Sequence, residues 1–92
     1  MEWKLFADLA ELAGEKRVAV DAEPGDTVET ALTALLDSRP ALEDRVFDEN
    51  GELEDHINLL RNGSNVFTQG SGLDTVLEEG DELALFPPVS GG

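Results

Sequence analysis

The fold of this chain is decided by the stretch DTVETALTALL at residues 26–36. Its apolar residues recur at i, i+3, i+4, i+7 and i+8, a spacing that puts them on one face of an α-helix: Val28, Ala31, Leu32, Leu35 and Leu36. Asp26 or Thr27 can cap the helix, and Pro40 stops it. We therefore predict one main amphipathic helix, which must bury its apolar face against another layer.

Short segments with alternating apolar residues lie on both sides of this helix. They predict strands at residues 2–6, 17–21, 56–61 and 82–86, and a small edge strand at Val66 and Phe67. In the first strand Trp3 and Leu5 share one face, and we expect Phe6 to turn into the core. Asn62-Gly63 is a strong signal for a hairpin turn after the strand at 56–61.

Three minor helical segments are also predicted. Asp8 with Glu11 resembles a capping box for a short helix that ends at Gly14. Residues 41–47 add one more helical turn after Pro40. Leu73, Val76 and Leu77 suggest another short turn before the last strand.

The order of these elements predicts the fold class. Two strands, one main helix and three further strands form an α+β arrangement in which a mixed sheet wraps one helix, the β-grasp (ubiquitin-like) fold. The first and last strands then lie side by side at the sheet's centre. We expect a single domain over residues 1–88 and a flexible tail over residues 89–92, because Pro87 and Pro88 cannot continue a strand.

Charge excludes several classes of partner. The 92 residues hold 21 acidic and six basic side chains, a formal charge of -15. Nucleic acid and anionic membrane are not expected as partners, since both require a cationic surface. The many carboxylates repel one another, and molar salt screens this repulsion, so we expect a halophilic protein that folds less well at low salt. We also expect a monomer.

Other classes of chemistry are excluded by composition. There is no cysteine, so disulfides, thiolate metal sites and cysteine nucleophiles are absent. The N-terminal residues show neither a signal peptide nor a membrane span, and we expect a cytoplasmic protein.

The chain ends in Gly91-Gly92, which follows Pro87-Pro88-Val89-Ser90. Gly92 has no side chain, so a narrow enzyme channel could admit this backbone and expose its carbonyl carbon to a nucleophile. A carboxylate is inert toward amines and thiols at neutral pH, so a partner enzyme would first have to form an acyl-adenylate with ATP. On the dipeptide alone, a frayed terminus remains an alternative.

Three blocks of sequence carry a resemblance to a known family. They are LFADLAELAG at residues 5–14, HINLLRNG at 56–63 and EGDELALFPPVSGG at 79–92. The chain resembles the ubiquitin-like small subunit of molybdopterin synthase, the MoaD/ThiS-type sulfur carriers and, more closely, the small archaeal modifier proteins of halophilic archaea. The likeness covers almost the whole chain.

This resemblance implies a function. A ubiquitin-activating-type enzyme would adenylate Gly92, with Gly91 and Ser90 giving access. A sulfur donor could then form a C-terminal thiocarboxylate for molybdenum cofactor synthesis with the large subunit of molybdopterin synthase. Alternatively, activated Gly92 would be joined to lysines of target proteins by an isopeptide bond. The chain itself would be a substrate rather than an enzyme, without a bound cofactor or metal.

Further residues are candidates for contact with partners. We expect docking through the last strand and the residues that follow it, with one neighbour from the preceding strand: Phe86, Pro87, Pro88, Val89 and Leu60. Lys4 and Lys16 are the only side-chain amines that could accept an isopeptide bond. So few lysines argue against long self-linked chains of the ubiquitin kind.

Other motifs favour structural explanations. His56 has no obvious serine or cysteine nucleophile to accompany it, so we expect a structural or solvent-exposed histidine. Residues 48–59 do not match a calcium loop, which needs glycine at its sixth position and glutamate at its twelfth. Gly70-Ser71-Gly72 lacks the lysine of a phosphate loop and predicts a flexible loop. The alternative function is a noncovalent β-grasp interaction domain with an incidental tail.

Overall fold

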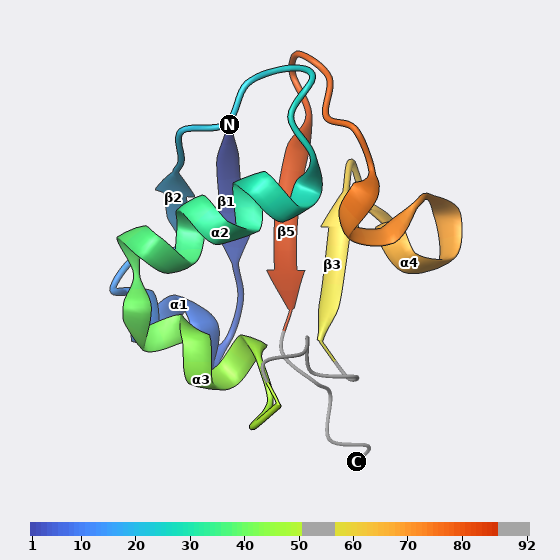
Figure 1. Cartoon of the computed structure of the whole chain (residues 1–92). Coiled ribbons are helices and arrows are strands. Elements are labelled where there is room, and N and C mark those ends of the chain that lie inside the picture. Colours follow the sequence, from blue (N-terminus) through green and yellow to red (C-terminus); the bar gives the residue numbers. More distant parts are fainter. Residues whose placement is uncertain (51–56, 87–92) are drawn as a thin grey trace.

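The computed structural model describes residues 1–50 and 57–86 and forms one mixed sheet under a main helix (Figure 1). The strands lie in the order β2-β1-β5-β3-β4. Their bounds are Glu2–Leu5 for β1, Arg17–Ala19 for β2, Asn58–Arg61 for β3, Ser64–Asn65 for β4 and Glu82–Phe86 for β5. The helices are α1 (Asp8–Ala13), α2 (Val28–Ser38), α3 (Glu43–Val46) and α4 (Val66–Gln69), with 3₁₀ turns η1 (Pro40–Leu42) and η2 (Gly72–Asp74).

The first and last strands are adjacent, as the β-grasp prediction requires. β1 runs parallel to β5 with Trp3 opposite Leu83, and β3 runs antiparallel to β5 with Leu59 opposite Leu85. Strand β5 therefore has a hydrogen-bonded neighbour on each side. It is the middle strand of the five.

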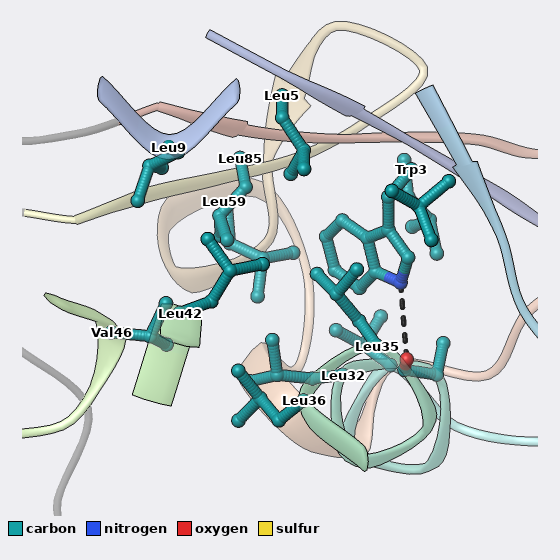
Figure 2. Close-up of a cluster of buried hydrophobic side chains, with 14 of the residues drawn as sticks. Trp3, Leu5, Leu9, Leu32, Leu35, Leu36, Leu42, Val46, Leu59 and Leu85 are labelled. Carbon is teal, nitrogen blue, oxygen red and sulfur yellow. Dashed lines mark hydrogen bonds between the residues drawn. The ribbon is translucent and has the colours of Figure 1, made fainter. Parts of the chain in front are cut away.

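The core fills the space between α2 and the sheet (Figure 2). The Trp3 indole is fully buried, and its Nε1–H donates a 3.0 Å hydrogen bond to the backbone oxygen of Ala31 in α2. Leu32 and Leu35 point toward Leu59 and Leu85 of the strands. Each such leucine contributes about 1.5–3 kcal/mol to stability through burial. The apolar residues of the helix and those of the strands therefore stabilise the same core.

The termini of the helices follow local chemistry in two places. Thr27 caps α2, where its side-chain oxygen accepts a hydrogen bond from the Thr30 amide. Gly14 ends α1 in the left-handed region at φ 81°, which a residue with a Cβ adopts only with strain. Both roles are as predicted, and residues after Pro40 do continue as η1 and α3.

The predicted capping box at Asp8 is wrong. The N-cap of α1 is Ala7, which has no capping side chain. Asp8 is already the first helical residue, and its carboxylate accepts a 2.8 Å hydrogen bond from Arg45 Nε in α3. An ion pair between two helices has replaced the local cap, which could not be seen from the spacing of Asp8 and Glu11.

The edge of the sheet also differs from the prediction. Asn62-Gly63 forms the expected two-residue hairpin, with positive φ of 53° and 84°. The edge strand, however, is Ser64–Asn65, while Val66 and Phe67 begin α4. Asn65 explains the change. Its side-chain oxygen accepts a 2.8 Å hydrogen bond from the Phe67 amide and so caps α4, which begins directly after Asn65.

The segment before β5 was only partly predicted. Leu73 lies in η2 and Leu77 is buried, but Val76 is extended, pairs with Thr27 in an isolated bridge and is 55% exposed. The expected helical turn therefore ends at Asp74. Among the residues that the structure describes, no helix is long and apolar enough to cross a membrane.

Candidate functional site

The centre of the sheet leads directly to the predicted tail. β5 ends at Phe86, which lies opposite Asn58 of β3, and the structural description stops there. The predicted residues Pro87, Pro88, Val89, Ser90, Gly91 and Gly92 lie outside the described residues, as does the proposed boundary at residue 88. Their roles remain predictions, but the structure does define the base from which they extend.

Phe86 stacks on Phe6 at this base. The ring centroids are 4.0 Å apart and the ring planes differ by 6°. Phe6 directly follows β1 and is 37% exposed, so the prediction that it turns into the core is wrong. Because Trp3 and Leu5 point inward, strand alternation sends Lys4 and Phe6 to the opposite face, where Phe86 lies.

Leu60 and Ala84 extend this apolar area across the same face. In β5, Leu83 and Leu85 are buried while Ala84 and Phe86 are half-buried. Leu60 lies opposite Ala84 and is also half-buried. We call the set Phe6, Leu60, Ala84 and Phe86 the tail-base surface. Leu60 and Phe86 are two of the docking candidates predicted from the sequence, and their docking role stays a prediction. Phe6 was not among the candidates, although alternation from Trp3 and Leu5 could have placed it on this face.

Lys4 borders the tail-base surface, where it makes an ion pair. It lies opposite Ala84 in the register, and its ammonium contacts the carboxylate of Glu82. The hydrogen bond from Lys4, and then its charge, lower the pKa of Glu82. The Lys4 side chain is 31% exposed, and the amine predicted as an isopeptide acceptor is already engaged by Glu82.

A second ionic cluster fixes the start of β5. Asp81 accepts a 2.6 Å hydrogen bond from Arg61 Nε, a 2.8 Å bond from Asn62 Nδ2 and a 2.7 Å bond from the Glu78 amide. Its side chain is only 5% exposed. Burial alone would raise the pKa of Asp81, but the three hydrogen bonds and the charge of Arg61 outweigh it, so the pKa is lowered. The same contact raises the pKa of Arg61.

The remaining motifs do not assemble a catalytic site in the described parts of the chain. His56 lies outside them. Of the acidic segment 48–59, the Asn50 amide donates to Asp48, and residues 51–56 are not described. The Ser71 amide donates a hydrogen bond to the Thr75 hydroxyl, and Gly72 begins η2, so this segment forms a hydrogen-bonded turn. Residues 1–50 and 57–86 hold no cluster of metal-ligating side chains.

Comparison with known proteins connects this arrangement to a family. The sequence profile described as "ThiS family" matches residues 3–92, which is nearly the whole chain. The chain belongs to the ThiS family. Small archaeal modifier protein 1 of Haloferax volcanii is 59% identical over 92 residues and all of both chains. Its crystal structure matches this ThiS-family chain with a TM-score of 0.87, covering 100% of this chain and 98% of that one.

Two more distant structures keep the same fold. One is the complex of BexX and CysO from Amycolatopsis orientalis, in which the matched chain is 27% identical with a TM-score of 0.79, covering 99% of this chain and 98% of that chain. The other is a Pyrococcus furiosus protein described as a candidate molybdopterin converting factor, subunit 1, at 25% identity and a TM-score of 0.72, covering 96% and 95%. This ThiS-family member is therefore similar over its full length to small modifier and carrier proteins.

Proposed function

We propose that this chain is a ubiquitin-like modifier and sulfur carrier that acts through the carboxylate of Gly92. The observation that carries the proposal is the combination of a central strand, β5, with a partly exposed aromatic stack at its end. Full-length identity of 59% to a small archaeal modifier protein supports the same function. The folded body presents the tail, while the chemistry takes place at Gly92.

The first step is activation by a partner enzyme. A ubiquitin-activating-type enzyme transfers AMP from ATP to the Gly92 carboxylate and releases pyrophosphate. Gly91 and Ser90 let the backbone enter a narrow channel. The tail-base surface, with Pro87, Pro88 and Val89 beyond it, gives this enzyme a surface to dock on. The chain's formal charge of -15 favours a less acidic or basic partner.

Two outcomes share the activated glycine. A sulfur donor converts the acyl-adenylate to a thiocarboxylate, which the large subunit of molybdopterin synthase uses to build the dithiolene of molybdenum cofactor. A lysine amine of a target protein forms an isopeptide bond instead. The relatives described as a molybdopterin converting factor subunit and as a modifier protein support one outcome each.

The proposed setting follows from charge. With 21 acidic and six basic residues, the chain suits the salt-rich cytoplasm of a halophile, where repulsion between carboxylates is screened. It acts as a substrate of its activating enzyme and not as an enzyme. ATP and the sulfur donor belong to the partners, and the chain binds no cofactor of its own.

Intact-mass spectrometry of tagged protein purified under denaturing conditions tests this function. A carrier shows replacement of one oxygen by sulfur at the C-terminus, and a modifier shows larger species that survive denaturation. The last tryptic site is Arg61, so a trypsin-cleaved conjugate carries residues 62–92 as its branch, and a search for Gly-Gly remnants would miss it. Absence of both species in cells with active molybdenum enzymes would contradict the proposal and favour a noncovalent interaction domain.

A further inference from the structure

The chain contains the pair Asn-Gly twice, at residues 50–51 and 62–63. Asparagine is one of the chemically labile residues, and it reacts most readily before glycine, whose backbone nitrogen has no side chain beside it. That nitrogen can attack the side-chain carbonyl carbon of the asparagine. The second pair, Asn62-Gly63, forms the turn between β3 and β4, and both residues are exposed to water. Burial therefore does not protect this pair from reaction.

Asn62 is held to the start of β5 by three hydrogen bonds. Its side-chain nitrogen donates to the Asp81 carboxylate at 2.8 Å, and its side-chain oxygen accepts from the Glu82 amide at 2.9 Å. Its backbone amide donates to the Glu82 carbonyl oxygen at 2.8 Å. Both polar atoms of the carboxamide are thus bonded to the residues that begin β5, and the side chain is directed toward them instead of toward Gly63.

The groups that hold this carboxamide are themselves fixed. The Asp81 carboxylate also accepts hydrogen bonds from Arg61 Nε and from the Glu78 amide, and its side chain is only 5% exposed. The Glu82 amide belongs to β5, the middle strand of the sheet. To leave these partners, the carboxamide must break a hydrogen bond to an ionised acceptor, which is roughly twice as strong as a neutral one.

The reaction that these contacts oppose is deamidation. A base in the solvent removes the proton from the Gly63 backbone nitrogen, which attacks Cγ of Asn62, and the new C–N bond closes a succinimide ring. Ammonia leaves as the bond from Cγ to the side-chain nitrogen breaks, taking up a proton from water. Water then opens the ring to aspartate or isoaspartate, so no oxidant or reductant is required. Ring closure needs Cγ to turn from β5 to the Gly63 nitrogen, which breaks both side-chain hydrogen bonds.

We infer that Asn62 is a deamidation site that Asp81 and Glu82 hold shut in the folded protein, and that it opens when β5 separates from the hairpin. The product prevents the contact from forming again. Its carboxylate replaces a group that donates to Asp81 at 2.8 Å, so two like charges face each other. Isoaspartate also lengthens the backbone by one carbon within a two-residue turn. The inference does not depend on chemistry at the C-terminus.

Peptide mapping by mass spectrometry tests the inference on the full chain. One sample is kept folded in molar KCl at neutral pH, and another is kept in urea at the same KCl. A brief tryptic digestion places Asn50 in the peptide of residues 46–61 and Asn62 in that of residues 62–92. We expect Asn62 to deamidate about tenfold to a hundredfold more slowly in the folded chain, the range set by loss of a charged hydrogen bond.

In urea the two asparagines should react at similar rates, because each precedes glycine and neither is held. Equal rates for Asn62 in the folded and unfolded samples overturn the inference. An Asn62 that stays intact in urea while Asn50 reacts overturns it too, since the site would then lack the reactivity that the fold is inferred to suppress.

A pair of variants separates the contact from general stability. Asp81→Ala removes the acceptor of the Asn62 side chain, whereas Leu36→Ala leaves it in place and destabilises the protein through a cavity in the core. Urea unfolding gives the unfolded fraction of each variant, so that each deamidation rate can be corrected for it. The corrected rate at Asn62 should rise about tenfold in Asp81→Ala only. Equal corrected rates in both variants overturn the inference.

The effect of the product is tested with Asn62→Asp. Asn50→Asp is the matched control, because it adds the same charge at an exposed residue outside the contacts of β5. In molar KCl we expect a clear fall in melting temperature for Asn62→Asp and little change for Asn50→Asp. Equal melting temperatures for the two variants would show that the product does not prevent the contact from forming and would overturn that part of the inference.

Discussion

Phe6 and Phe86 lie ring on ring, 4.0 Å apart between centroids, at the ends of two parallel neighbouring strands. The contact joins the first strand of the domain to the last described residue before the tail. It leaves Phe6 37% exposed and Phe86 half-buried, so part of the stack remains available to a partner. A stacked aromatic pair of this kind stabilises the base and also provides contact area for docking.

Phe6→Ala should therefore weaken binding to the activating enzyme. We expect a rise in Kd of about tenfold or more, the range of a typical aromatic hot spot, and a stability loss of about 0.5–1.5 kcal/mol from the missing stack. Titration calorimetry at fixed KCl measures the first and denaturant unfolding the second. Phe67→Ala is the control, because Phe67 is exposed on α4 and belongs to no part of the tail-base surface. Equal effects of both substitutions on Kd would refute this role.

Ala7→Gly should stabilise the protein. Ala7 has φ 54° and ψ −132°, and the hydrogen bond from the Leu9 amide to the Phe6 oxygen closes a tight turn around it. Strain of this kind costs about 1–3 kcal/mol in a residue with a Cβ, which outweighs the extra freedom of glycine in the unfolded chain. We expect a gain of about 1 kcal/mol by urea unfolding. Ala10→Gly, inside α1, should lose about 0.5–1 kcal/mol, and a loss in both variants would contradict the assigned strain.

Asp81→Asn should destabilise the start of β5 in a manner that depends on pH. The lowered pKa of Asp81 means that its ionised form is favoured in the folded state. A buried charged hydrogen bond of this kind contributes about 2 kcal/mol to the free energy of unfolding. This contribution is complete above the ordinary aspartate pKa of about 4, and it is lost as the pH falls through the lower pKa that Asp81 has in the folded state. The wild type should exceed the variant in stability at neutral pH, and this difference should shrink in acid.

Unfolding of both proteins in urea across this pH range measures the effect. Asp37→Asn is the matched control, because it removes an exposed carboxylate from α2 and makes the net charge less negative by the same amount. It should show no such loss. A difference for Asp81→Asn that stays constant from neutral to acid pH would show that the carboxylate charge contributes nothing.

Salt should control stability more than in an ordinary domain. The formal charge is -15, and at tens of millimolar salt the Debye length exceeds about 10 Å, so carboxylates on neighbouring elements repel each other. Molar KCl removes most of this repulsion. We expect the melting temperature followed by circular dichroism to fall steadily as KCl is diluted. A melting temperature that does not change over this range would refute adaptation to high salt.

Most of the fold could be predicted because its signals are local and agree with one another. Val28 to Leu36 follow a helix period, Trp3 and Leu5 follow a strand period, and Asn62-Gly63 forms the turn that its residues favour. One failure is local, because Asn65 caps a helical turn where an edge strand at Val66 and Phe67 was expected. Another lies where a contact distant in sequence prevailed. Asp8 pairs with Arg45 instead of capping its helix.

The candidate site was predicted only where it follows from a single strand. Leu60 and Phe86 were identified because each belongs to a recognisable strand. Strand alternation could have placed Phe6 on the exposed face, but it could not place Phe6 beside Phe86, which is eighty residues away along the chain. Its position depends on the β1–β5 register, in which Leu5 lies opposite Leu85, and no local pattern specifies that register.

ATP-pyrophosphate exchange with a chain that lacks Gly91 and Gly92 tests the central claim most directly. The full chain and the truncated chain are compared with the same activating enzyme, ATP and KCl, after circular dichroism has shown that both are folded. The proposed function predicts that truncation abolishes exchange and every covalent adduct, because the reacting carboxylate is lost while the folded body remains. Exchange and adducts that persist in the truncated chain would contradict it and would leave a noncovalent interaction domain as the function.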